Sequence, residues 1–267
     1  KLYQRGLENG LDVKMLSGEE VNEREPHVRA LKGVYVPSTG IVNYIDVATA
    51  YANVFRSAGG EIFTNTELRS VSETQDDIIA ETTTKEIEKK KVINCAGLYS
   101  DKVAQLFGLK LDVQIVPFRG EYYELDSSKH LLNNLIYPVP NPDFPFLGVH
   151  FTRMMNGHVH IGPNAVLSFK REGYVKTDFD VRETMSVLTY PAFWKIAFRN
   201  AKEGLQEMYK SISKKAFLQD VQRYFPMITE GELHPADAGV RAQALSNDGK
   251  LLDDFLIAKT KRAIHVL

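Results

Sequence analysis

The sequence predicts a mixed α/β (α+β) fold, and three observations carry this prediction. Residues 92–101, VINCAGLYSD, join an apolar run to a turn of small residues and then to a helix. From residue 111 the pattern becomes rich in β-type residues, and residues 182–225 carry apolar positions at helical spacing. With 267 residues, of which 43% are hydrophobic and 25% charged, the chain can bury the core of one large domain or of two intertwined domains.

Capping signals and apolar spacing define the elements of the first 110 residues. The predicted helices lie at about residues 17–26, 46–58 and 100–107, and the predicted strands lie at 61–71, 78–84 and from 92 onward. Asp46, Ser100 and Asp101 are residue types favoured at helix N-caps, and Gly59-Gly60 ends the middle helix. A polar link at 85–91 leads into the strand at Val92. We expect Val92–Ala96 to pair in a sheet beside Thr64–Val71.

The second half of the chain predicts strands followed by helices. The predicted strands lie at 113–116, 117–125, 148–152 and 158–163, and the predicted helices at 182–188, 191–198, 204–212 and 217–225. Asn156-Gly157 is a strong turn signal, so 148–152 and 158–163 should form a hairpin. A proline-rich link at 137–146 precedes this hairpin.

Composition and charge exclude several classes of protein. The net charge of −1 argues against a nucleic-acid partner, and Lys89-Lys90-Lys91 fits a solvated turn. The single cysteine, Cys95, has no partner for an internal disulfide, and we expect it to be a small buried side chain in a reducing compartment. Apolar runs are too short for a membrane span. We therefore expect a cytoplasmic protein, with any membrane contact peripheral and at the inner membrane.

Histidines and cations supply the candidate chemistry. His150 lies between Gly148 and Thr152, and a neutral imidazole suits the removal of a hydroxyl proton near pH 7, with a purely structural role as the alternative. His158 and His160 share one strand face, but no cysteine or acidic cluster accompanies them in sequence, so we predict no metal site.

Arg241 lies in a short apolar strand, where its guanidinium suits a planar carboxylate. An ordinary ion pair with Asp237 or Asp248 is the alternative. A dicarboxylate would need a second cation, and the candidates are Arg119 and Lys170.

The small-residue turn at Ala96-Gly97 ends a strand and precedes a helix, which suits an anionic cofactor. The alternative is a plain β-to-α connection in an α/β protein.

Taken together, ordered blocks along nearly the whole chain resemble the L-2-hydroxyglutarate dehydrogenase (oxidase) family of flavoenzymes, within the D-amino-acid oxidase-like superfamily. The blocks are PSTGIVNYIDVATAYA, TNTELRSV, NCAGLYSD, IVPFRGEYYEL, IYPVP, FPFLGVHFT, IGPNAVLSFKREGY, EMYK and AGVRAQALSNDGKLLDDF. The resemblance implies FAD, oxidation of a small-molecule 2-hydroxy acid, L-2-hydroxyglutarate, to 2-oxoglutarate, and a membrane-linked electron acceptor instead of NAD.

The resemblance also implies how the fold divides. We expect an incomplete FAD-binding α/β region at 40–110 and 235–267, and a β-sheet substrate-binding region with helices at 1–39 and 111–234. The family begins with a βαβ unit carrying G-x-G-x-x-G, which this sequence lacks, and it continues beyond the residues at which this chain stops. We therefore expect an internal fragment that lacks both ends of the cofactor site and binds FAD poorly or not at all.

Matching positions receive roles from the resemblance. Leu68 matches a position whose backbone faces the adenine, and Ala96 and Gly97 match the small turn beside the cofactor. Arg241 matches the arginine that holds the substrate α-carboxylate. For His150 as base and Arg119 at the distal carboxylate, the family supplies no assigned role, and we infer that their strands face the flavin. Lys170 is the second candidate for the distal carboxylate. Another flavoenzyme of the superfamily, oxidising amino acids or glycerol 3-phosphate, and an inactive fragment or binding module remain alternatives.

Overall fold

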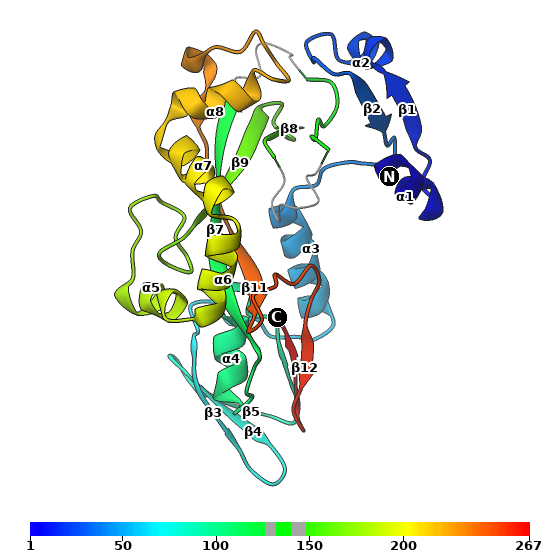
Figure 1. Cartoon of the computed structure of the whole chain (residues 1–267). Coiled ribbons are helices and arrows are strands. Elements are labelled where there is room, and N and C mark those ends of the chain that lie inside the picture. Colours follow the sequence, from blue (N-terminus) through cyan, green and yellow to red (C-terminus); the bar gives the residue numbers. More distant parts are fainter. Residues whose placement is uncertain (126–131, 140–147) are drawn as a thin grey trace. The chain divides into compact units, whose positions relative to one another are not determined.

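The computed structural model describes residues 1–125, 132–139 and 148–267 (Figure 1). The chain forms two compact units. Unit 1 contains Lys1–Val47, Gly120–Val166 and Lys202–Gly239, and unit 2 contains Ala48–Arg119, Leu167–Ala201 and Val240–Leu267. Residues 111–119 and 167–201, which we expected among the substrate-binding segments, are grouped with unit 2. The functional assignment of the expected regions stays a prediction.

The expected mixture of helices and sheets is confirmed. The helices are α1 (Leu2–Glu8), α2 (Gly18–Arg24), α3 (Tyr44–Ser57), α4 (Ser100–Leu106), α5 (Val181–Leu188), α6 (Pro191–Arg199), α7 (Ala201–Ile212) and α8 (Lys214–Val221), with short 3-10 turns η1 (Gly97–Tyr99) and η3 (Glu230–Glu232). The strands are β1 (Lys14–Ser17), β2 (Lys32–Tyr35), β3 (Leu68–Glu73), β4 (Ile78–Thr82), β5 (Glu86–Lys89), β6 (Val92–Asn94), β7 (Val113–Leu125), β8 (His150–Arg153), β9 (Val159–Leu167), β10 (His234–Pro235), β11 (Gly239–Ser246), β12 (Ile257–Lys259) and β13 (Ala263–Val266).

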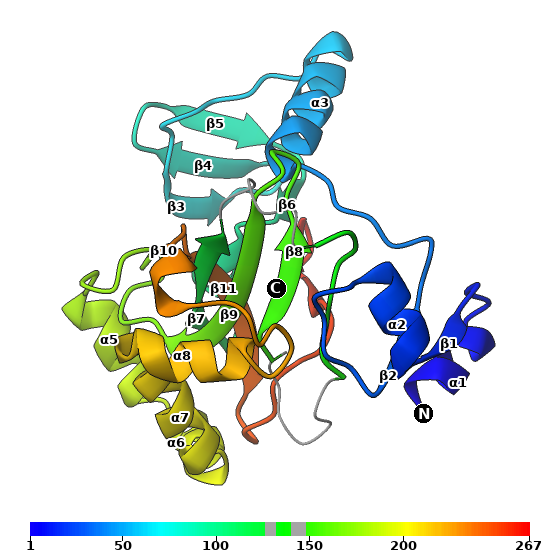
Figure 2. The ribbon, with the colours of Figure 1, turned by 90° about the horizontal axis from the view of Figure 1, so that it is seen from above.

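A sheet of order β10-β7-β9-β8 organises unit 1, and β11 pairs with the long strand β7. The predicted hairpin is confirmed, because β8 and β9 pair antiparallel from His150↔Gly162 to Arg153↔Val159 and lie side by side in Figure 2. Its turn uses the expected residues. The Asn156 side chain accepts a hydrogen bond from the His158 backbone at 3.0 Å, and Gly157 has a φ of 87°.

Helix α8 buries an apolar face in the core of unit 1. Phe217 and Val221 of α8 are fully buried in one cluster with Phe151 of β8 and Ile161 of β9. The cluster extends to Leu16, Val21 and Val28 of the N-terminal segment. That segment forms the antiparallel hairpin β1-β2 around α2, a pairing that its polar sequence did not predict.

In unit 2 the partner of β6 differs from the prediction. Strand β6 pairs in parallel with β13, from Val92↔Ala263 to Asn94↔His265, in a sheet of order β12-β13-β6. The segment expected beside it contributes β3, which pairs with β4 in a separate sheet of order β3-β4-β5. The prediction of pairing with Thr64–Val71 was therefore wrong. It relied on neighbours in sequence, whereas the true partner lies about 170 residues away.

Three local predictions also need correction. Residues 85–91 are not only a link, because they contain strand β5, in which Ile87 pairs with Ala80 of β4. Helix α3 begins earlier than expected, and the Asn43 side chain accepts from the Ile45 backbone at its start. Cys95 is exposed, because β6 ends at Asn94 and the chain turns there.

The start of α4 also differs from the prediction, because its N-cap is not one of the two expected residues. Ser100 and Asp101 are N-cap residue types, yet Tyr99 occupies the N-cap and both side chains are buried inside unit 2. The apolar cluster of this unit joins Val116 of β7, Val187 of α5 and Leu245 of β11. No helix among the described residues is both long and apolar enough to cross a bilayer.

Candidate functional site

One buried asparagine, Asn94, fixes the turn after β6 through two hydrogen bonds to the backbone. The Asn94 amide donates to the Ser100 carbonyl at 2.8 Å, and its oxygen accepts from the Ala96 backbone at 3.1 Å. The same amide lies 3.1 Å from Nδ1 of the fully buried His265, whose pKa is lowered by burial. A neutral His265 that accepts from Asn94 at Nδ1 therefore ties β13 to this turn.

Ala96 and Gly97, the predicted cofactor contacts, lie exposed at the tip of this turn. Gly97 has a φ of 54°, a conformation that glycine adopts without cost, and a Cβ placed on it would meet no other atom within 4 Å. The backbone is thus open to close approach by a ligand. This open turn of small residues fits the FAD that the family resemblance implies.

A buried ion pair behind the same turn was missed by the sequence analysis. Arg171 donates from Nη1 to Oδ1 of Asp101 at 2.6 Å and from Nη2 to Oδ2 at 2.8 Å. Only 4% of the Arg171 side chain and none of the Asp101 side chain is exposed. Nη1 also donates to the Leu98 carbonyl in η1. No local signal marks this pair, because its members lie 70 residues apart.

Arg119 and Lys170, the predicted cations for a distal carboxylate, are organised by one segment of unit 2. Arg119 in β7 is 5% exposed, and its Nη1 donates to the Val175 carbonyl at 3.2 Å. Lys170 lies half-buried in a tight turn, where its carbonyl accepts from the Ser168 hydroxyl at 2.6 Å and from the Gly173 backbone at 3.1 Å. Residues 168–175 therefore carry one of the two candidates and bind the other.

Arg241 and Leu68 also belong to unit 2. Arg241 lies on a strand, β11, as predicted, and it is exposed. No ion pair joins it to a carboxylate in the part of the chain that the structure describes. Asp248, one proposed alternative partner, lies 2.8 Å from Lys250 instead. Leu68 begins β3, half-buried and opposite Thr82.

His150, the predicted base, belongs to unit 1. Its Nδ1 lies 3.3 Å from the Gly148 carbonyl, and its ring stacks on Tyr137 with centroids 4.4 Å apart. A ring nitrogen that faces a carbonyl must donate, so Nδ1 carries the proton and Nε2 carries the lone pair. Burial lowers the pKa of His150, against a smaller rise from the Gly148 bond. The imidazole is therefore neutral near pH 7 and can accept a proton at Nε2.

His158, which directly precedes β9, and His160 of β9 both contact Glu124. His158 Nδ1 lies 2.8 Å and His160 Nε2 3.0 Å from its two carboxylate oxygens. These contacts lower the pKa of Glu124. Within 1–125, 132–139 and 148–267, no group of three or more acidic, histidine or cysteine side chains is arranged to hold a metal ion.

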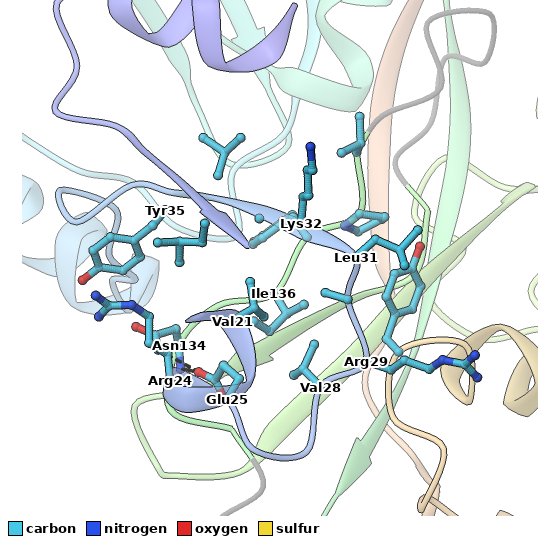
Figure 3. A pocket seen from close by; sticks show the side chains of 18 of the residues that line it. Val21, Arg24, Glu25, Val28, Arg29, Leu31, Lys32, Tyr35, Asn134 and Ile136 are labelled. Atoms are coloured by element: carbon cyan, nitrogen blue, oxygen red, sulfur yellow. Dashed lines mark hydrogen bonds between the residues drawn. The ribbon is translucent and has the colours of Figure 1, made fainter. Parts of the chain in front are cut away.

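A pocket of about 730 Å³ lies in unit 1, apart from the predicted residues. Figure 3 shows Val21, Val28 and Ile136 in its wall, with Arg24 and Tyr35 at one side. The carboxylate of Glu25 in this wall accepts from the backbones of residues 133 and 134 at 3.0 and 2.5 Å. His150 is not among the residues that line this pocket, although Tyr137, on which its ring stacks, is one of them.

Comparison with known proteins identifies the family. Residues 1–267 match the model of the DAO family, FAD dependent oxidoreductase. The chain is 44% identical over 266 residues to L-2-hydroxyglutarate dehydrogenase of Escherichia coli (strain K12), covering 99% of this chain and 63% of that protein. It is 47% identical over 269 residues to the protein of that name from Indibacter alkaliphilus (strain CCUG 57479 / KCTC 22604 / LW1), covering 100% of this chain and 67% of the relative.

A solved structure supports the same fold. The FAD-bound, dithionite-reduced L-alpha-glycerophosphate oxidase from Mycoplasma pneumoniae superposes with a TM-score of 0.74 at 20% sequence identity, covering 99% of this chain and 62% of that one. At this identity the likeness concerns the fold alone. The chain spans 63% of the length of the Escherichia coli relative. On the match to the family model over its whole length, this chain belongs to the FAD dependent oxidoreductase (DAO) family.

Proposed function

We propose that the protein containing this chain oxidises L-2-hydroxyglutarate to 2-oxoglutarate with FAD and passes the electrons to an acceptor other than NAD. The observation that supports this most is the 44% and 47% identity, over 99% or more of the chain, to relatives named L-2-hydroxyglutarate dehydrogenase. The match to the Indibacter alkaliphilus relative covers the whole chain and therefore spans the segments that carry the candidate residues.

The cofactor contacts in the proposal come from unit 2. Leu68, Ala96 and Gly97 would hold FAD through their backbones, and the open turn at Gly97 leaves room for it. When bound, FAD would supply the oxidising chemistry, as acceptor of the hydride from the carbinol carbon. The chain itself supplies orientation and proton management.

Substrate orientation in the proposal depends on cations. The exposed guanidinium of Arg241 offers a planar two-point contact for the α-carboxylate. The distal carboxylate needs a second cation, for which Arg119 is the first choice and Lys170 the second. Arg119 is already fixed by the Val175 carbonyl, so it would present its charge with little loss of conformational entropy.

Proton removal is assigned to His150. Its Nδ1 donates to the Gly148 carbonyl, which leaves the Nε2 lone pair to accept the hydroxyl proton. Because burial lowers the pKa of His150, the ring is unprotonated near neutral pH and ready to act as a base.

Turnover assays test this proposal. The protein that contains this chain is purified with FAD and given L-2-hydroxyglutarate, D-2-hydroxyglutarate, glycerol 3-phosphate or glycine, with a soluble quinone or NAD as acceptor. We expect 2-oxoglutarate from the L isomer and the quinone only. Quinone reduction would also support a membrane-linked acceptor. Turnover of glycine or glycerol 3-phosphate in its place would assign another flavoenzyme activity, and flavin-free protein would indicate a binding module.

A further inference from the structure

The buried pair Arg171–Asp101 has no part in the proposed chemistry, yet it is the most completely paired charge cluster described in unit 2. Each oxygen of Asp101 accepts two hydrogen bonds. Besides the two from Arg171, the Lys102 backbone donates to Oδ1 at 2.8 Å and the Ile115 backbone donates to Oδ2 at 3.1 Å. Burying two charges is expensive unless such partners compensate, so this arrangement specifies a geometry more than it adds stability.

One end of the pair fixes the turn proposed to contact FAD. The guanidinium of Arg171 donates to the Leu98 carbonyl, directly after Ala96-Gly97, and lies 5.7 Å from the ring centroid of Tyr99. Asp101 anchors the first turn of α4 to β7 through Ile115. The position of the 96–98 backbone therefore depends on this pair together with Asn94, which accepts from the Ala96 backbone.

The other end of the pair fixes the segment that organises the substrate cations. The Arg171 backbone donates to the Glu183 carboxylate of α5 at 2.7 Å, which holds the turn in place. Lys170 is the adjacent residue, and the Val175 carbonyl in the same segment binds Arg119. A shift of Arg171 would thus move both candidate cations and the cofactor turn.

We propose that Arg171, paired with Asp101, is a positioning residue that couples the FAD-contacting turn at 96–98 to the segment 168–175, which sets the cations for the distal carboxylate. This inference rests on the proposed function. Lysine at position 171 would keep the charge but could not reach both Asp101 oxygens and the Leu98 carbonyl with a planar fork.

The test compares Arg171→Lys and Asp101→Asn with the wild type, in the protein that contains this chain. The dissociation constant of FAD is measured by the quenching of flavin fluorescence on binding, and KM and kcat for L-2-hydroxyglutarate are measured separately, well below each melting temperature. We expect the FAD dissociation constant and KM each to rise by about tenfold or more, as for loss of a hydrogen bond to a charged group, with a smaller fall in kcat. Glu183→Gln, which leaves the ion pair intact, serves as a milder variant if these two fail to fold, and it should raise KM.

The matched control is Lys210→Met in unit 1, where Lys210 lies 2.9 Å from Glu207 and 2.5 Å from Asp220. It should lower the melting temperature without changing FAD affinity. Variants at 171 and 101 that behave like this control, with an unchanged FAD dissociation constant and KM, would overturn the positioning role. A wild type that binds FAD but does not oxidise L-2-hydroxyglutarate refutes the proposed substrate alone. In that case, a weaker FAD affinity of the Arg171→Lys and Asp101→Asn variants still supports the part of the inference that concerns the cofactor. A wild type that binds no FAD refutes both proposals.

Discussion

Replacing Asp101 by asparagine should destabilise unit 2 far more than removal of a surface charge. The Arg171 guanidinium would remain 4% exposed with its charge uncompensated, because the carboxylate that it contacts at 2.6 and 2.8 Å is gone. Asparagine could still accept from the Ile115 or the Lys102 backbone with its one oxygen. The loss therefore comes mainly from the orphaned arginine.

Removing one partner of a buried ion pair costs about 3–5 kcal/mol in proteins. A domain of this size loses about 2–4 °C in melting temperature for each kcal/mol. We therefore expect Asp101→Asn to melt about 6–20 °C below the wild type.

The single tryptophan, Trp194, provides the assay, because it lies in α6 of unit 2 and its fluorescence reports the unfolding of that unit. Asp248→Asn is the matched control. Asp248 forms an exposed pair with Lys250, so its loss should leave the melting temperature within error. An Asp101→Asn protein that melts with the wild type would show that an Arg171 without its carboxylate costs unit 2 no stability.

Three further changes have defined outcomes. His150→Gln should slow reduction of bound FAD by L-2-hydroxyglutarate by about 10²–10⁴-fold in rapid mixing experiments. Burial lowers the pKa of His150, and only its neutral form accepts a proton, so wild-type kcat/KM should fall on acidification below pH 6.5. This acid limb of the pH profile should be absent in the His150→Gln variant. A variant that retains the acid limb would remove His150 from the proton transfer. Arg241→Lys should raise KM by at least about tenfold, because lysine lacks the planar fork, and an unchanged KM in steady-state assays would exclude Arg241 from carboxylate binding. Gly162→Ala should lower the free energy of unfolding, measured in urea, by about 1–3 kcal/mol, because Gly162 has a φ of 146° and a Cβ there would lie 2.8 Å from the Glu121 carbonyl oxygen. Gly204→Ala in α7 is the control. A Cβ there meets no atom within 4 Å, so this change should be neutral or stabilising.

Local signals in the sequence predicted local structure well. Asn156-Gly157 defined the β8-β9 hairpin because the turn chemistry is contained in two residues. The helix predicted at 17–26 forms as α2, and the structure shows a capping box of Ser17 and Glu20 at its start. Arg241 was correctly placed on a strand, and the open glycine turn at Gly97 was expected.

Contacts between distant segments could not be predicted in this way. Asp101 has the chemistry of an N-cap, but Arg171, 70 residues later, takes its carboxylate into the core. Strand β6 carries no information on whether β3 or β13 will pair with it, because an apolar run fits either neighbour. The sequence favoured Arg119 for its charge and its predicted strand, and only the fold shows that the Val175 carbonyl binds it.

Anaerobic reduction of bound FAD by each enantiomer of 2-hydroxyglutarate tests the central claim most directly. In the protein that contains this chain, a single addition of the L isomer should bleach the flavin absorbance near 450 nm and yield one equivalent of 2-oxoglutarate, while the D isomer should leave the spectrum unchanged. Bleaching by the D isomer but not by the L isomer would contradict the proposed function, and so would a flavin that neither isomer reduces.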